Sequence, residues 1–296
     1  MLQLPLPGLD DPEGHTVPDP SLSVCDAHVH LFPDAVFQAM WNWFDNYAWP
    51  VRYRLTSPEI VKFLHSKGVR HVVGLHYAHK PGIAGALNRY MAGLCAEYPS
   101  LTGTATVFPG EKGTREILEE GFELGLSGVK LHAHVQCFHL DGPGMNEIYE
   151  ACVAHDKPLV MHVGREPRNP DYPYPVDPYV TCDSGKLERV LSEYPSLRIC
   201  VPHMGADEFA EYRRMSERYD NLWLDIAMVA ADYLPNTEPP RLAEMRTDRI
   251  MYGSDFPNIP YAWDRELKKV HAQGLPRDVM ERILGLNCLE FFSISA

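Results

Sequence analysis

The sequence contains no run of about 20 consecutive apolar residues, which a helix that crosses a membrane would need. Residues 1–20 lack the basic and apolar segments of a secretory signal and are rich in proline, so we expect a proline-rich N-terminal extension there. The seven cysteines are odd in number and show no C-x-x-C spacing. They therefore predict reduced thiols in a cytoplasmic protein rather than a disulfide framework.

Positive charge is also in short supply. The 296 residues include 27 lysines and arginines against 40 acidic residues, which gives a formal net charge of −13. Proteins that bind nucleic acid or anionic membranes need a basic face, so we expect neither as a partner. A small anionic substrate remains compatible with this charge, because a metal ion or a few arginines can reverse the field locally.

A glycine-rich phosphate loop is absent after the first strand-like run, where His30-Leu31-Phe32-Pro33 stands instead. Strand-like and helix-like segments alternate eight times, which predicts parallel strands joined by right-handed crossovers. The expected strands are Ser23–Leu31, Val69–Tyr77, Leu101–Phe108, Gly128–His134, Pro158–Val163, Leu197–His203, Leu222–Met228 and Ile250–Ser254. We therefore predict an α/β protein, a single (β/α)₈ TIM barrel over residues 21–296. A doubly wound open sheet is the alternative, but it usually carries the missing loop.

Two connections are unusually long, and both follow the C-terminal end of a strand, where barrel enzymes build their active sites. Residues 32–56 are rich in aromatic side chains, and residues 165–182 are rich in proline and tyrosine. We expect the aromatic segment to be a loop insertion in which Phe37, Met40, Trp41 and Phe44 fall at helical spacing, so a helix packed on the barrel rim or on another subunit is the alternative. Two interpretations remain equally open for it, a lid over the site and an interface between the subunits of a homodimer.

The stretch Asp26-Ala27-His28-Val29-His30 closes the first strand-like run. Side chains alternate between the two faces of a strand, so His28 and His30 project the same way. Two imidazoles that converge on one point can bind a divalent metal. The alternative is that one histidine caps the strand and the other makes a structural hydrogen bond.

Other polar side chains stand at the C-terminal ends of later strands, and in a closed barrel those ends form one ring. These residues are Lys130, His132, His162, His203 and Asp255. Any one of them alone has an ordinary explanation, since a histidine can be structural and an aspartate can cap the next segment. Together with His28 and His30, their matching positions favour a single functional site. His76 and His79, at the end of the second strand, could contact substrate, but we expect them to have surface roles.

This pattern resembles the amidohydrolase superfamily. The spellings Asp-Ala-His-Val-His, Gly-Val-Lys-Leu-His, His-Met-Gly and Tyr-Gly-Ser-Asp-Phe-Pro are similar to its amidohydrolase-related (amidohydrolase 2) branch. That branch contains hydrolases, lactonases and non-oxidative decarboxylases such as aminocarboxymuconate-semialdehyde decarboxylase. The resemblance implies that His28, His30, His162 and Asp255 bind one divalent ion, zinc before manganese, which activates a water. It also implies that His203 is a general base or polarises the substrate, and that Asp255 moves a proton.

The resemblance leaves the residue on the fourth strand ambiguous. In other members a lysine there is carboxylated and bridges two metals; we expect one metal and an unmodified Lys130 that binds a substrate carboxylate or forms an ion pair. His132 shares the face of Lys130, and Arg165 offers a bidentate fork for a carboxylate, although a solvated loop charge is the simpler interpretation of Arg165.

Three functions follow from these expectations. The favoured one is a metal-dependent hydrolase of a lactone, ester or amide bond in a small cyclic or aromatic molecule. The second is a metal-dependent non-oxidative decarboxylase of a small carboxylic acid. The third is a non-catalytic binding protein with the same barrel.

Overall fold

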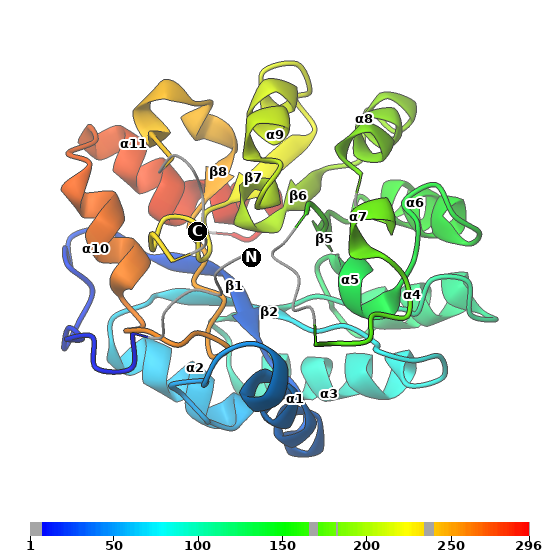
Figure 1. The fold of residues 1–296 in the computed structure, drawn as a ribbon, viewed down its shortest axis with the longest axis horizontal. Coiled ribbons are helices and arrows are strands. Elements are labelled where there is room, and N and C mark those ends of the chain that lie inside the picture. Colours follow the sequence, from blue (N-terminus) through cyan, green and yellow to red (C-terminus); the bar gives the residue numbers. More distant parts are fainter. Residues whose placement is uncertain (1–7, 166–170, 182, 234–239, 296) are drawn as a thin grey trace.

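Eight parallel strands stand at the centre of the molecule, and helices surround them (Figure 1). The computed structural model describes residues 8–165, 171–181, 183–233 and 240–295. The strands are β1 Cys25–His30, β2 His71–Leu75, β3 Leu101–Gly103, β4 Val129–His132, β5 Leu159–His162, β6 Ile199–Val201, β7 Leu222–Asp225 and β8 Ile250–Met251. Most of these residues are buried and apolar, as expected for strands that are covered on both faces.

The strands close into a barrel. They pair in sequence order as two sheets, β1-β2-β3 and β4-β5-β6-β7-β8. An isolated parallel bridge between Ala105 and Val129 joins β3 to β4, and another between Val29 and Phe256 joins β1 to the segment after β8. The predicted (β/α)₈ barrel is therefore confirmed, and the open-sheet alternative is wrong.

Helices and short turns connect the strands. The α-helices are α1 Asp34–Tyr47, α2 Ser57–Ser66, α3 Ala84–Glu97, α4 Thr114–Glu123, α5 Ala133–Gln136, α6 Met145–Ala154, α7 Pro178–Thr181, α8 Ser184–Glu193, α9 Phe209–Ser216, α10 Arg265–Ala272, α11 Arg277–Glu281 and α12 Asn287–Phe291. The 3₁₀ turns are η1 Pro202–Gly205, η2 Leu242–Glu244 and η3 Thr247–Arg249, and η4 Arg282–Leu286 is a π-helical turn. No helix among the described residues is long and apolar enough to cross a membrane.

The aromatic segment at residues 32–56 is not simply a loop, because most of it is helix α1. Phe37 and Trp41 are buried on one face of that helix, and their rings stack with centroids 5.5 Å apart. Phe37 also meets Phe32 edge to face at 5.7 Å. The helix therefore packs its apolar face against residues of the barrel mouth, as the helical spacing of the aromatics requires. Whether it acts as a lid or as a subunit interface stays a prediction.

Several strands end earlier than expected. β3 stops at Gly103, and β6 stops at Val201 because Pro202 begins a 3₁₀ turn. His203, Met228 and Asp255 all have left-handed backbones, with φ of 54°, 60° and 61°. Strand residues need negative φ, so these positions cannot continue a sheet. The chain thus turns out of the sheet just where polar side chains are needed at the mouth.

The described part of the expected N-terminal extension is tied to the barrel rather than detached from it. The Arg52 guanidinium donates to the backbone oxygen of Asp11, the N–H of Val17 donates to Lys67, and the N–H of Gly14 donates to the Asp264 carboxylate. These bonds join residues 8–17 to the connection after α1, to the C-terminal end of α2 and to the start of α10. The expectation that residues 21–296 form one domain stays a prediction.

Candidate metal centre

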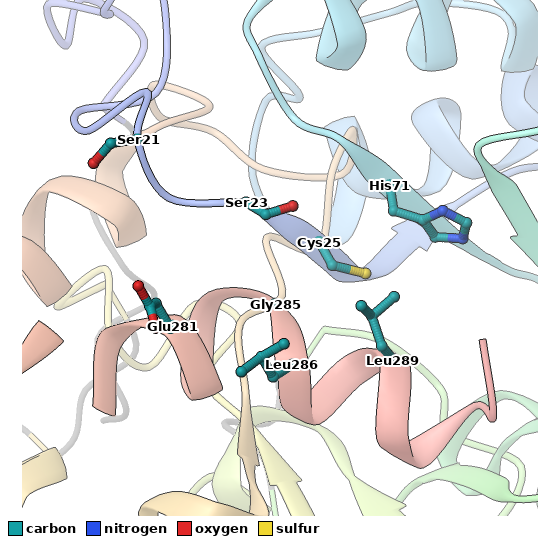
Figure 2. Close-up of a pocket in the computed structure, with 8 residues that line it drawn as sticks. All are labelled: Ser21, Ser23, Cys25, His71, Glu281, Gly285, Leu286 and Leu289. Carbon is teal, nitrogen blue, oxygen red and sulfur yellow. The ribbon is translucent and has the colours of Figure 1, made fainter. Parts of the chain in front are cut away.

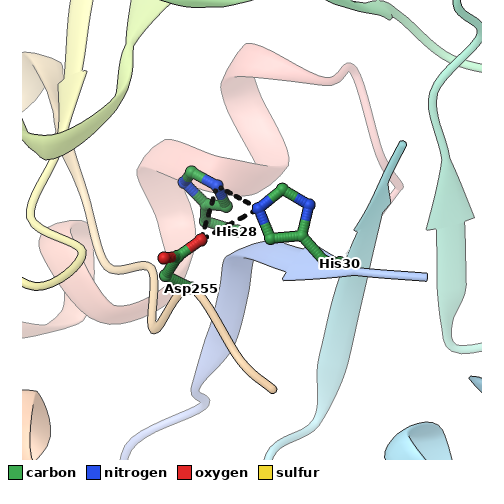
Figure 3. A group of neighbouring side chains, drawn as sticks. All are labelled: His28, His30 and Asp255. Atoms are coloured by element: carbon green, nitrogen blue, oxygen red, sulfur yellow. Dashed lines mark hydrogen bonds and ion pairs between the residues drawn. The ribbon is translucent and has the colours of Figure 1, made fainter. Parts of the chain in front are cut away.

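β1 presents two histidines side by side at its C-terminal end (Figure 3). Both are buried, and their Nε2 atoms lie 3.3 Å apart. Asp255, in the segment after β8, places its Oδ1 atom 2.9 Å from the Nε2 of His30 and 3.3 Å from that of His28. One ligand atom from each of the three residues lies within 4.8 Å of the others. β1 and the segment after β8 are neighbours only because the barrel closes at that seam.

The three residues fit a divalent ion. Zinc bonds to histidine nitrogen at about 2.0–2.1 Å, so two nitrogens on a tetrahedral ion stand roughly 3.3 Å apart. The two Nε2 atoms have that separation. Imidazole with carboxylate is a donor set that suits zinc and also manganese. His28, His30 and Asp255 are therefore the residues that would hold the ion.

Protonation also favours metal binding. Burial lowers the pKa of His28 to about 4 and lowers that of His30, and the nearby charge of Lys130 acts in the same direction. Both imidazoles are therefore neutral at pH 7 and offer lone pairs. Burial opposes ionisation of Asp255, but the hydrogen bond and charge of His30 outweigh it and hold the pKa of that carboxyl below its usual range. The site thus combines two neutral nitrogens with one carboxylate.

Asp225, the last residue of β7, orients the centre from behind. Its Oδ2 accepts the Nδ1–H of His28 at 2.8 Å, and its Oδ1 accepts the N–H groups of His203 and Ala227 at 3.0 and 3.1 Å. The carboxylate thereby directs the Nε2 lone pair of His28 toward the ion site. Asp225 is not among the residues predicted from the sequence. The sequence signal for it is an acidic residue at the end of the apolar run Leu-Trp-Leu-Asp.

Asp26 holds the backbone on which the histidines stand. Its Oδ1 accepts the N–H of His28 and that of Ser254, each at 3.1 Å, and its Oδ2 accepts the Ser254 hydroxyl at 2.5 Å. Burial raises the pKa of this carboxyl to about 7. Asp26 therefore links β1 to the residue that precedes Asp255, which fixes the spacing between the candidate ligands.

His162 and His203 lie beside this group. The ring centroid of His203 is 5.2 Å from that of His28 and 4.7 Å from that of His162. Among the described residues, His162 does not join the tight group of three ligand atoms. Its ring stacks instead on His132 with centroids 3.9 Å apart, and burial lowers its pKa well below the usual value. Its role as a fourth ligand stays a prediction.

His203 has a defined tautomer because its Nδ1 lies 3.0 Å from the backbone oxygen of Ala227. A carbonyl can only accept, so Nδ1 carries a proton, and in the neutral form of this imidazole the lone pair is on Nε2. The structure also explains why the His-Met-Gly motif ends in glycine. A Cβ at Gly205 would overlap the Tyr212 ring, and the residue has a left-handed φ of 79°. The roles of His203 and Asp255 as proton carriers stay predictions.

The residues expected to bind substrate lie at different depths. Lys130 is fully buried, and its charge lowers the pKa of three histidines of the ring. His132 forms part of the wall, between Tyr77 and His162. Arg165 stands farther out, with nearly half of its side chain exposed and its Nε 3.9 Å from Glu208. Their substrate contacts stay predictions.

One expectation about the rim was wrong. His76 is buried, and its Nε2 lies 3.1 Å from the Oδ1 of Asn88. Burial lowers its pKa to about 4. It therefore supports the end of β2 from inside, whereas His79 is exposed as expected. The sequence predicts a second strand that ends at Tyr77, but it does not show that the chain stays buried as far as Ala78.

A protein-family profile described as Amidohydrolase matches residues 25–294. The chain belongs to the amidohydrolase family. That match spans both β1, which begins with Cys25, and the C-terminal helix α12. No curated protein sequence matches this amidohydrolase.

Solved structures share the fold of this amidohydrolase. The 5-carboxyvanillate decarboxylase of Sphingomonas paucimobilis is 16% identical with a TM-score of 0.63, over 93% of this chain and 100% of the other. That of Novosphingobium aromaticivorans, in complex with manganese and 4-hydroxy-3-methoxy-5-nitrobenzoic acid, is 20% identical with a TM-score of 0.65, over 95% and 99%. A Pseudomonas putida protein named as a candidate 2-pyrone-4,6-dicarboxylic acid hydrolase is 19% identical with a TM-score of 0.63, over 93% and 99%. At these identities the likeness establishes the fold.

Proposed function

We propose that this amidohydrolase is a metal-dependent hydrolase that cleaves a lactone, ester or amide bond in a small cyclic or aromatic carboxylic acid. The observation that carries the proposal is the buried group of His28, His30 and Asp255, with the Nε2 lone pair of His203 free of its backbone bond. A divalent ion held there, zinc before manganese, would supply a Lewis acid and lower the pKa of a water.

The chain's own residues supply the proton chemistry. Asp255 is ionised over the working pH range and can accept a proton from the attacking water. His203 keeps its Nδ1–H on Ala227, so its Nε2 can accept a proton and then donate it to the leaving oxygen or nitrogen. His162 lies 4.7 Å from His203, ring to ring, and belongs in this scheme as the fourth ligand.

The substrate class is proposed from charge and from the solved relatives. Lys130 is buried on β4 beside the ring, and its ammonium group would suit a substrate carboxylate. The relatives are named for 5-carboxyvanillate and for 2-pyrone-4,6-dicarboxylic acid, which are small cyclic acids. We propose one ion and an unmodified Lys130. Two metal equivalents per chain, or a mass increment of one carbon dioxide on Lys130, would contradict that part.

The test starts with elemental analysis of protein purified without chelator. A panel of carboxylated lactones, esters and amides is then assayed in heavy-oxygen water. We expect about one divalent ion per chain and label in the product. The His30→Ala variant should lose both metal and activity, whereas His79→Ala, which removes an exposed histidine near the mouth, should keep both. Metal retained in His30→Ala, or no labelled product from any panel member, would overturn the proposal.

A second candidate is non-oxidative decarboxylation, which the relatives named as 5-carboxyvanillate decarboxylases favour. The same ring would serve, with His203 or Asp255 delivering a proton to the carbon that loses the carboxylate. Release of carbon dioxide from an aromatic acid, with no heavy oxygen from water in the aromatic product, distinguishes this reaction from hydrolysis. A metal-loaded protein that turns over neither class would leave the binding-protein interpretation.

A further inference from the structure

The described cysteines are free, but two of them touch. Cys25 begins β1 and Cys288 lies in α12, and the thiol of Cys25 donates to the sulfur of Cys288 at 2.7 Å. Both side chains are buried in a small apolar cluster that also contains Cys200. This cluster closes the end of the barrel opposite to the metal centre, because His30 stands at the other end of the same strand.

The fold holds these two thiols together from both sides. Gly285 lets the π-helical turn η4 lie directly against the start of β1, since a Cβ there would collide with the backbone oxygen of Ser23. The Asn287 amide donates to the backbone oxygens of Thr247 and Ile250, each at 2.7 Å. The helix that carries Cys288 is therefore fixed on β1 and β8, and the contact does not depend on a mobile side chain.

A cavity of about 220 Å³ leads to one member of the pair (Figure 2). Cys25 lines it together with Ser23, His71 and Leu289, whereas Cys288 is not among the lining residues and is fully buried. His71 is the register partner of Cys25 in the pairing of β1 with β2. Burial lowers the pKa of His71, so its imidazole is neutral at pH 7, and its Nε2 lies 2.9 Å from the Thr102 hydroxyl.

We propose that Cys25 and Cys288 form an oxidation site that hydrogen peroxide converts to a disulfide. The Cys25 sulfur attacks one peroxide oxygen; the O–O bond breaks, one water leaves, and Cys25 becomes a sulfenic acid. The Cys288 sulfur then attacks the Cys25 sulfur, the S–O bond breaks, and a second water leaves. The two thiols lose two electrons and two protons in total, and the peroxide is reduced to two waters.

The division of roles follows from access. Cys25 lines the cavity and meets the oxidant first. Burial raises the pKa of the Cys288 thiol well above its usual value, so Cys288 is poorly ionised and serves as the resolving thiol rather than as the first nucleophile. Cys200 belongs to the same apolar cluster, and its pKa is raised by burial too, which makes it the matched control.

The test treats the full chain, reduced and freed of reductant, with hydrogen peroxide at equimolar ratio. We expect loss of two hydrogen masses, loss of two titratable thiols, and a Cys25–Cys288 cross-link in the non-reducing peptide map that dithiothreitol reverses. The disulfide would link β1 to α12 across 263 residues of sequence, so the melting temperature should rise by about 5 °C or more.

Single cysteine substitutions test which thiols react, and none of these tests needs an enzyme assay. Cys200→Ser should still form the disulfide. Cys288→Ser should stop at a Cys25 sulfenic acid, which dimedone traps. A different cross-link, no loss of thiols in the intact chain, or disulfide formation that persists in Cys288→Ser would overturn the proposal.

Discussion

His28 and His30 occupy equivalent positions on β1, yet they differ in what lies behind each imidazole. The Nδ1–H of His28 is accepted by Asp225, whereas the Nδ1 of His30 is buried and has no hydrogen-bond partner among the described residues. One candidate ligand is therefore held in a fixed tautomer by a carboxylate, and the other is positioned by packing beside Phe32 and Tyr77. We therefore expect Asp225 to affect how tightly this centre would bind an ion.

Asp225→Asn should weaken metal binding about 10–100-fold. The asparagine oxygen can still accept from His203 and Ala227, but its amide would face the Nδ1 of His28 and donate to it. His28 would then carry its proton on Nε2 and lose the lone pair that the ion needs. Competition with a chromogenic chelator measures the affinity. Asp220→Asn, at an exposed aspartate that pairs with Arg246, should bind metal as the parent does.

A second prediction concerns Glu266, which is fully buried at the start of α10. One of its oxygens accepts the Tyr261 hydroxyl at 2.5 Å and the N–H of Met228 at 3.1 Å. Burial raises its pKa from 4.5 to about 8. Between these values the folded chain keeps a proton that the unfolded chain has lost, so stability must fall as pH rises through this window.

Glu266→Gln should remove this pH-dependent loss of stability, because the amide oxygen can accept the same two hydrogen bonds without ever ionising. Between pH 5 and pH 9, the free energy of unfolding of the variant should increase relative to that of the parent by roughly 2–5 kcal/mol. Urea unfolding at several pH values measures it. Parallel pH profiles for the two proteins would show that Glu266 is ionised throughout.

At the scale of elements, the connections after the strands do more than join them. η1 replaces the end of the expected sixth strand, with left-handed backbones at His203, Met204 and Gly205. That turn aims the His203 side chain inward and packs Gly205 under the Tyr212 ring of α9. The geometry of His203, the proposed proton carrier, therefore depends on how a turn meets the following helix.

Gly205→Ala should destabilise the protein by about 1–3 kcal/mol or more, since the new methyl group overlaps the Tyr212 ring at a φ that alanine disfavours. The melting temperature measures this. The matched control is Gly93→Ala in α3, where a Cβ meets nothing within 4 Å. That change should be neutral or stabilising, because alanine favours helix. Equal melting temperatures for the two variants would contradict the packing argument.

At the scale of the whole molecule, barrel closure creates the centre. His28 and Asp255 are far apart in sequence, and the seam between β1 and the segment after β8 makes them neighbours, with the N–H of Asp255 bonded to the backbone oxygen of His28 at 2.9 Å. An ion at this seam would link the first and last strands of the barrel. Metal binding and global stability should therefore be coupled.

Removal of metal by a chelator should lower the melting temperature by several degrees. A ligand at 100 times its dissociation constant stabilises the folded state by about 2.7 kcal/mol. Differential scanning calorimetry with and without EDTA, followed by zinc or manganese addition, measures the effect. The His30→Ala variant should melt at one temperature in all three conditions, and a chelator effect that survives in it would point to metal bound elsewhere.

The amino-acid sequence by itself determined the barrel and most of the ring. Strand alternation put His28 and His30 on one face, and eight repeats of strand and helix made the C-terminal ends a single ring. Sequence spacing is local, however, and it stopped at the strand ends. Only the tertiary structure turned His203 and Asp255 inward through left-handed backbones. It alone brought Asp225 behind His28 and Cys288 onto Cys25, because such contacts follow from closure and packing of distant segments.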